Sequence, residues 1–207
     1  AKAQVALIDL ALDKLREGQP ARFAEVPEDQ RREWRMLQLL TSKPVLFIAN
    51  VDEESAATGN EMSRAVEKRA AEEGAVCVTI SAKIEAELAL LDADERAEYL
   101  ESLGLAEPGL NRLIHAGYRL LDLQTYFTAG PKEARAWTIR KGWKAPRAAG
   151  VIHGDFEKGF IRAETIAFDD YVALNGEAGA REAGKLRQEG KEYVVQDGDV
   201  LLFKFNV

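Results

Sequence analysis

The chain has 207 residues, of which 46% are hydrophobic, so it can bury a core in one large domain or two small ones, and we expect two. Its net charge of −7 at pH 7 excludes a nucleic-acid footprint over the whole surface, and its single cysteine excludes a disulfide framework, as suits a reducing compartment. No apolar run approaches the ~20 residues that span a bilayer, so we expect a soluble, cytoplasmic protein with no membrane partner.

Two helices are expected at the beginning of the chain. Apolar residues recur at helical spacing from Val5 to Leu15, and Gly18 with Pro20 ends this first helix. A second helix is expected in residues 27–40, where acidic residues in the first turn suit the helix dipole. The two patterns predict a helical pair.

A strand, helix and strand pattern follows. Residues 45–50 (VLFIAN) and 75–81 (AVCVTIS) are apolar runs typical of strands, and residues 61–74 between them predict a helix that ends at a glycine. This spacing predicts a parallel crossover unit whose strands are buried on both faces. Acidic helical sequence follows in residues 84–103, and residues 109–123 carry an apolar stripe at helical spacing.

The pattern changes after about residue 122, where we place a domain boundary. Two strands around a Pro-containing turn are expected in residues 126–139, a third in residues 160–168 and two more in residues 191–207. Short helices are expected in residues 145–153 and 179–187. Residues 191–207 contain two strand runs joined by an Asp-Gly turn. A small mixed sheet with a helix packed over it is the expected result.

Positive charge is concentrated in one stretch. Residues 1–121 carry 15 Lys and Arg against 22 Asp and Glu, whereas residues 122–207 carry 13 of each. In residues 131–147 two tryptophans and one acid alternate with six basic residues, which are Lys132, Arg135, Arg140, Lys141, Lys144 and Arg147. Such a run is often only solvated surface, but cations beside aromatic rings also suit RNA bases and phosphates, and both interpretations stay open.

Polar residues follow both apolar strands of the crossover unit. Asn50 to Glu53 follow the first strand, and Ser81, Ala82 and Lys83 follow the second. Because the carboxyl ends of parallel strands meet at one edge, these residues are expected to form one pocket. An asparagine amide can meet a purine ring nitrogen, and a backbone N–H opposite can reach a base substituent. The pattern predicts nucleotide-base recognition; the alternative is a polar loop whose carboxylates help to start the next helix.

Five segments carry a resemblance to a known family: LTSKPVLFIANVDE, ISAKIEAELAL, EPGLNRLIHAGYRLLDLQTYFTAGPKEARAWTI, KAPRAAGVIHGDFEKGFIRAETIAF and VQDGDVLLFKFNV. They resemble the YchF, or Obg-like, ATPases, a family of P-loop NTPases. The resemblance implies an α/β plus α+β fold. It implies that residues 1–36 end a helical insertion, that residues 37–121 are the C-terminal part of the nucleotide-binding domain with its parallel sheet, and that residues 122–207 are a ubiquitin-like β-grasp TGS domain.

The resemblance also implies which purine is bound. Guanine-specific relatives of this group read the base with Asn-Lys-x-Asp, whereas Val51 and Glu53 occupy the Lys and Asp positions here. Adenine presents an acceptor where guanine presents donors, and such a mismatch costs ~1–3 kcal/mol per group. The resemblance therefore implies a preference for ATP over GTP, with base contacts from Asn50, Val51, Glu53, Ser81, Ala82 and Lys83.

The chain lacks the motifs that bind phosphates. No G-x-x-x-x-G-K-S/T appears, nor an upstream strand with an Asp for magnesium. The resemblance implies that the chain is the C-terminal portion of a ribosome-associated ATPase that uses Mg with ATP. We expect this portion to have no catalytic residue and no metal site of its own, and not to hydrolyse ATP alone. The alternative is a non-catalytic module that binds RNA or the ribosome through residues 122–207.

Overall fold

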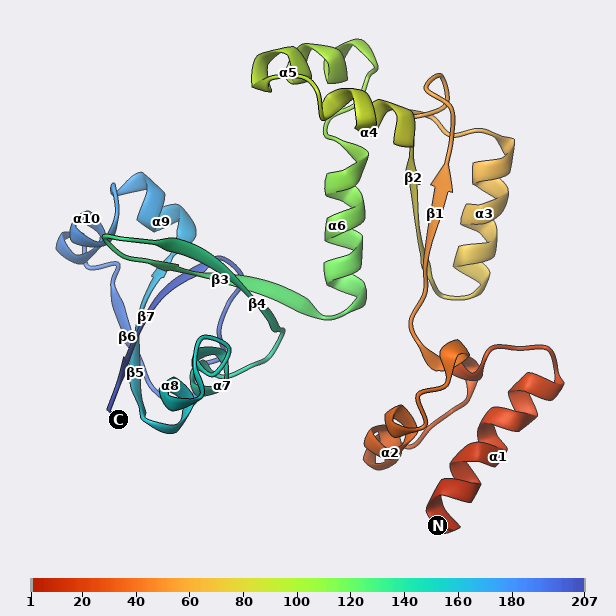
Figure 1. Cartoon of the computed structure of the whole chain (residues 1–207), viewed down its shortest axis with the longest axis horizontal. Helices are drawn as coiled ribbons and strands as arrows, with labels where there is room; N and C mark the ends of the chain where they lie inside the picture. The colour runs from red at the N-terminus through yellow and green to blue at the C-terminus, as the bar shows by residue number, and fades with distance from the viewer. Residues whose placement is uncertain (1, 207) are drawn as a thin grey trace. The chain divides into compact units, whose positions relative to one another are not determined.

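The computed structural model (Figure 1) describes residues 2–206, and side chains from residue 4 onward. The chain divides into two compact units, residues 1–116 and residues 117–207. The division lies within one helix, α6 (Gly109–Leu120). The domain bounds expected from sequence, 1–36, 37–121 and 122–207, stay a prediction.

The first unit begins with a small helical layer. Its elements are α1 (Lys2–Arg16), α2 (Arg31–Met36) and the 3-10 turns η1 (Ala21–Phe23), η2 (Glu28–Gln30) and η3 (Leu40–Ser42). Leu7, Ala11, Ala21 and Trp34 form its buried core. The predicted second helix, residues 27–40, is wrong in length, because its α-helical part ends at Met36 and Gln38 adopts a left-handed backbone with φ +50°.

The crossover unit follows the predicted order of strand, helix and strand. Strands β1 (Leu46–Asn50) and β2 (Val76–Ile80) pair in parallel, with Asn50 opposite Ile80 at the carboxyl ends. Helix α3 (Glu61–Glu72) connects them and lies alongside both strands (Figure 1). Asn60 starts this helix with a capping box, in which its side chain accepts from the N–H of Ser63.

Burial of these strands on both faces was expected, and the structure shows this to be wrong. Ile48 in β1 is 49% exposed and Val76 in β2 is 43% exposed. A continuous apolar run suits a strand inside a wider, covered sheet. The described part of the chain contributes only two strands and the single crossover helix α3 to this sheet, which leaves apolar surface open.

Three further helices complete the first unit and lead into the second. They are α4 (Ala82–Leu88), α5 (Ala93–Ser102) and α6. The predicted acidic helix at 84–103 is two helices, because the carboxylate of Asp92 accepts from the N–H groups of Asp94 and Glu95, both at 3.0 Å, and starts a new helix there. Ala56, Ile84, Leu88 and Leu100 form the apolar core of this part.

The second unit is a mixed five-stranded sheet with short helices. Its elements in chain order are β3 (Leu123–Ala129), β4 (Ala134–Arg140), α7 (Ala145–Ala149), α8 (Gly154–Lys158), β5 (Phe160–Ala167), α9 (Phe168–Ala173), α10 (Glu177–Glu182), β6 (Arg187–Glu189) and β7 (Asp199–Phe205). The strand order is β4-β3-β7-β5-β6 (Figure 1). Strands β3 and β7 pair in parallel, and the other pairs are antiparallel. The predicted fold class, a small parallel sheet followed by a mixed sheet, is confirmed.

The core of the second unit lies between the sheet and α7. Tyr126, Ile139, Leu201 and Phe203 pack against three alanines of α7, which are Ala145, Ala148 and Ala149. Small side chains let the helix lie close to the strands. The Tyr126 hydroxyl donates to the carbonyl of Ala148 at 3.0 Å, and burial raises the pKa of this tyrosine.

The predicted strand in residues 191–195 is wrong. Lys144 and Val194 form one isolated bridge there, and the short strand β6 lies earlier, beginning at Arg187, the last residue of the helix expected in residues 179–187. Apolar residues recur in this segment because Val195 is buried and Tyr193 packs against the core from a loop. The Asp-Gly turn before β7 is confirmed by the φ of +82° at Gly198. Val207, expected in the last strand, lies outside the described residues.

Candidate functional site

The carboxyl ends of β1 and β2 are joined by two hydrogen bonds. The N–H of Val51 donates to the carbonyl of Ile80 at 2.8 Å, which extends the parallel ladder one residue past β1. The Oδ1 atom of Asn50 accepts from the N–H of Ala82 at 2.9 Å. Asn50 and Ala82 were both predicted as site residues, and the structure brings them into direct contact.

These hydrogen bonds decide which polar groups are left to meet a ligand. The N–H groups of Val51 and Ala82 are both engaged, so neither is free to reach a base, and the N–H of Lys83 is the next donor along the chain. Because Oδ1 of Asn50 is also engaged, its amide NH2 remains as a donor. A donor at this position suits the ring nitrogen N7, an acceptor that adenine and guanine share.

An ion pair lies next to this link. The ammonium of Lys83 is 2.8 Å from Oε1 and 2.9 Å from Oε2 of Glu53. Glu53 is the main cause of the raised pKa of Lys83. The side chains of Lys83 and Glu53 are 67% and 38% exposed. The ion pair therefore connects the loop after β1 to the start of α4 at the protein surface.

The remaining predicted residues of the edge are buried. Val51 is 9% exposed and Ser81 is 3% exposed. The hydroxyl oxygen of Ser81 meets no hydrogen-bond partner within residues 2–206. An unpaired buried hydroxyl is unfavourable by about 1–3 kcal/mol. Val51 thus leaves only a small part of its apolar side chain open at the edge, and the hydroxyl of Ser81 is unpaired there.

The alternative interpretation of this loop, that its carboxylates start the next helix, is wrong. Helix α3 is capped by Asn60, eight residues after Asp52. The carboxylate of Asp52 instead accepts from the N–H of Ser55 at 2.9 Å, inside its own loop, and its bonds to Ser55 lower the pKa of Asp52. Asp52 therefore shapes the loop that carries Glu53.

Two arginine–tryptophan pairs mark the basic stretch of the second unit. The guanidinium of Arg135 lies 4.2 Å from the ring centroid of Trp137, and that of Arg147 lies 4.0 Å from the ring centroid of Trp143. Both indole rings pack against the same core. Stacked cation and ring pairs of this kind are stabilising in themselves and also present flat, positively charged surface.

The other basic residues of this stretch are spread over the unit. Lys132 lies in the turn between β3 and β4, and Lys141 directly follows β4. Arg140 lies five positions after Arg135 on β4, so strand alternation places the two side chains on opposite faces. Lys144 precedes α7 and pairs with the exposed Glu192. The structure therefore does not gather all six predicted basic residues on one face.

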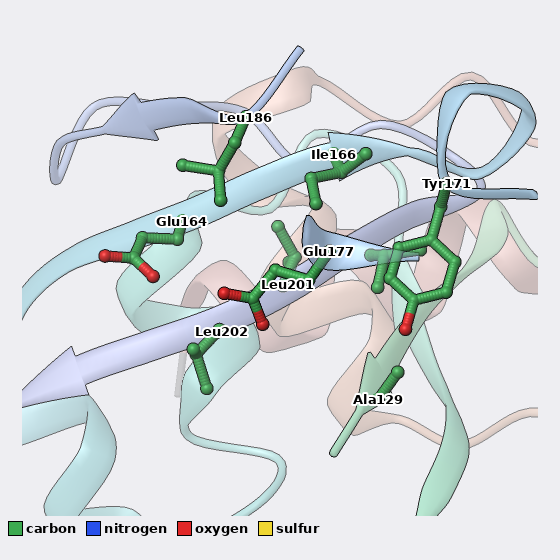
Figure 2. A pocket seen from close by; sticks show the side chains of 9 residues that line it. Ala129, Glu164, Ile166, Tyr171, Glu177, Leu186, Leu201 and Leu202 are labelled. Atoms are coloured by element: carbon green, nitrogen blue, oxygen red, sulfur yellow. The ribbon is translucent and has the colours of Figure 1, made fainter. Parts of the chain in front are cut away.

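A hollow in the second unit has no room for a ligand. Figure 2 shows it beside β5 and β7, where Glu164, Tyr171, Glu177 and Leu202 surround it. Its volume is about 10 Å³, which is room for one water molecule at most. The carboxylate of Glu164 lies 3.5 Å from the ammonium of Lys204, so its charge is already balanced.

A larger hollow of about 240 Å³ lies beside α4, α5 and α6. Two of its polar side chains are bonded to the backbone: Glu85 accepts from the N–H of Gly109 at 2.7 Å, and Arg96 donates to the carbonyl of Leu88 at 3.2 Å. The rest of its lining is mostly apolar, including Pro108 and Leu110. Neither of these two hollows includes a predicted site residue.

Comparison with known proteins places the chain in a family. The family model YchF-GTPase_C, described as a protein of unknown function (DUF933), matches residues 123–206. The ribosome-binding ATPase YchF of Bacillus subtilis is 54% identical over 95% of this chain. That of Escherichia coli O157:H7 is 52% identical over the whole chain. The solved structure of the Schizosaccharomyces pombe YchF GTPase matches with a TM-score of 0.83 and 35% identity, over 96% of this chain and 53% of that one. The chain belongs to the YchF family.

The YchF relatives are considerably longer than this chain. It spans 55% of the length of the Bacillus subtilis protein and 57% of the Escherichia coli protein, and the matched part is C-terminal. Within residues 2–206 of this YchF chain, no group of three or more His, Cys, Asp and Glu side chains is placed to hold a metal. No helix in the same range has both the length and the apolar character to cross a membrane.

Sequence reasoning named Glu53 and Lys83 in this YchF chain but missed that they pair. A signal was present: Glu53 stands three residues after the end of β1 at Asn50, and Lys83 three residues after the end of β2 at Ile80. Because Asn50 and Ile80 are in register, the acid and the base stand at equivalent positions of adjacent segments. Opposite charges at equivalent positions favour an ion pair.

Proposed function

We propose that this chain is the C-terminal portion of a ribosome-associated ATPase, in which the edge formed by β1 and β2 recognises the adenine base. The observation that carries the proposal is the hydrogen bond from the Ala82 N–H to Asn50, which fixes the amide of Asn50 with its NH2 as the remaining donor. The relatives are ribosome-binding ATPases by name, which supports the same activity for the intact protein. The intact protein would act in the cytoplasm.

In this proposal each residue of the edge has a physical role. The amide of Asn50 donates to a purine ring nitrogen, and the apolar Val51 packs against the base. The N–H of Lys83 meets a base substituent, while Glu53 stands where guanine-specific relatives have an aspartate. Ala82 holds the second segment in place through its bond to Asn50, and Ser81 precedes it at the start of α4.

The chemistry of hydrolysis lies outside this chain. A P-loop binds phosphates through its backbone N–H groups and its lysine, and Mg²⁺ needs oxygen ligands beside them. The 207-residue sequence contains no P-loop motif. Residues 2–206 contain no group of three or more His, Cys, Asp and Glu side chains that could hold Mg²⁺. The proposed role of this portion is base selection, and the portion of the relatives that this chain does not cover would supply the phosphate and Mg²⁺ contacts.

The proposal is tested by titrating the ¹⁵N-labelled chain with AMP and with GMP. We expect weak, millimolar binding of AMP, with chemical-shift changes at Asn50, Val51, Ala82 and Lys83, and weaker binding of GMP. Phosphate release from ATP by the same sample is expected to stay at the background rate. Chemical-shift changes confined to other residues would contradict the assignment of the base site to this edge. Measurable ATP hydrolysis would contradict the proposal that the phosphate and Mg²⁺ contacts come from outside this chain.

We propose in addition that residues 122–207 form a TGS domain that presents a basic surface to ribosomal RNA. The two stacked pairs, Arg135 on Trp137 and Arg147 on Trp143, are the observation in favour of this role. Guanidinium planes on aromatic rings suit both stacked bases and phosphates. If the β1–β2 edge proves inactive, this module alone is the alternative function.

Charge reversal tests the RNA surface. The double variant Arg135→Glu, Arg147→Glu is expected to weaken binding of the chain to purified bacterial ribosomes and to reduce the salt slope of the binding constant by about 2, one for each lost phosphate contact. Arg181→Glu is the control, because Arg181 lies on α10 and already pairs with Glu177. Equal losses of ribosome affinity for the double variant and the control would show that Arg135 and Arg147 do not form the RNA-binding surface.

A further inference from the structure

The carboxylate of Glu53 is held by a cation from the opposite segment of the proposed base site. Both carboxylate oxygens face the Lys83 ammonium, at 2.8 and 2.9 Å. Lys83 directly follows Ala82, whose N–H holds Asn50. The ion pair and the asparagine link therefore join the same two segments side by side, so whatever enters this edge meets Glu53 already paired.

The pairing bears directly on which purine the edge accepts. Guanine presents two donors, its ring N1–H and its exocyclic amine, and needs a carboxylate with free oxygens to accept them. Adenine presents an unprotonated ring nitrogen at the same place, which an unscreened carboxylate repels. A carboxylate whose two oxygens face an ammonium is a poorer acceptor for guanine and a weaker source of repulsion for adenine.

We propose that Lys83 is a specificity-determining residue, which disfavours guanine by holding Glu53 in an ion pair. This inference rests on the proposed base site. To bind guanine as a free carboxylate would, Glu53 must first leave Lys83. Both side chains are partly exposed, at 67% and 38%, so solvent screens the pair. Exposed ion pairs of this kind account for about a two- to fivefold change in an equilibrium.

The first test is Lys83→Met, which keeps the aliphatic stem and removes the charge. The chain is titrated with AMP and GMP, and the ratio of the two affinities is compared with that of the unchanged chain. We expect the preference for AMP to fall about two- to fivefold, through tighter GMP binding. Any attraction between Lys83 and a phosphate cancels in this ratio, because the two nucleotides carry the same phosphate. A ratio that stays constant while both affinities fall would overturn the inference.

A double-mutant cycle shows whether the effect passes through Glu53. In a Glu53→Gln background, Lys83→Met is expected to leave the AMP to GMP ratio unchanged, because no carboxylate remains to be released. Lys68→Met, at an exposed lysine of α3, is the matched control and should leave the ratio unchanged in both backgrounds. The same change of ratio in both backgrounds would overturn the role of the ion pair.

The two proposals fail in different ways. If the unchanged chain binds AMP at the edge and Lys83→Met leaves the ratio as it was, the base site stands and the specificity role of Lys83 is wrong. If the unchanged chain binds neither AMP nor GMP at millimolar concentration, both the base site and the inference that rests on it are wrong.

Discussion

Replacing Asn50 by Asp is expected to lower the affinity of the chain for AMP about tenfold or more. An aspartate keeps the oxygen that accepts from the Ala82 N–H, now at 2.9 Å, so the link between the two strand ends can persist. It removes the NH2 donor and places a carboxylate oxygen opposite the purine ring nitrogen. Two facing acceptors cost about 1–3 kcal/mol, and a value near the middle of this range gives the expected loss. AMP titration followed by ¹⁵N chemical shifts measures it.

Two further variants separate the roles of the Asn50 oxygen and amine. Asn50→Ala removes both and is expected to lose AMP binding together with the link to Ala82, seen as a large shift of the Ala82 amide resonance. Asn111→Ala removes an exposed asparagine of α6 in the same unit and should leave binding unchanged. If Asn50→Asp binds AMP as tightly as the unchanged chain does, Asn50 does not donate to the base.

The crossover unit could be predicted because local patterns and geometry agree there. The apolar runs at 45–50 and 75–81 are too short for helices, and a helical pattern with a final glycine separates them. Parallel pairing then follows from the crossover, and it places Asn50 and Ile80 together at the carboxyl ends. This pairing alone is enough to predict that Asn50 and Ala82 lie close together.

The orientation of the Asn50 amide at the edge could not be predicted. Whether Asn50 presents its oxygen or its amine depends on one backbone N–H, that of Ala82, which comes from 32 residues away. Strand periodicity says nothing about such a contact. The pairing of Glu53 with Lys83 was closer to prediction, because the two residues stand at equivalent positions after strands whose ends are in register.

The loop at residues 191–195 shows why an apolar pattern can be misassigned. Val195 is 1% exposed, and the Tyr193 hydroxyl donates to Asp199 at 2.7 Å, so both side chains face inward as they would from a strand. The backbone of this segment nevertheless forms only the single bridge at Val194. Core packing alone can generate such a pattern, because burial requires no ladder of hydrogen bonds.

Replacing Gly159 by Ala is expected to destabilise the second unit by about 3 kcal/mol. Gly159 follows α8 where β7 ends, and its carbonyl accepts from the N–H of Asn206 at 2.9 Å. A Cβ atom there would lie 1.8 Å from the carbonyl oxygen of Asn206 and 2.8 Å from its carbonyl carbon. Both are backbone atoms, so the chain directly after β7 would have to move. Overpacking typically costs 1–3 kcal/mol, and a clash with backbone belongs at the upper end.

The measurement is urea unfolding followed by the indole N–H resonances of Trp137 and Trp143, which pack against the core of the second unit. Gly154→Ala is the matched control, since a Cβ at Gly154 meets no atom within 4 Å. Gly154 begins α8, where alanine favours the helix, so this variant should change stability by no more than about 1 kcal/mol, in the stabilising direction.

A Gly159 variant as stable as the Gly154 variant would mean that the end of β7 does not pack against α8 as described. If the Gly159 variant unfolds at lower urea but the resonances of the β1–β2 edge still respond to AMP, base recognition does not depend on the stability of the second unit.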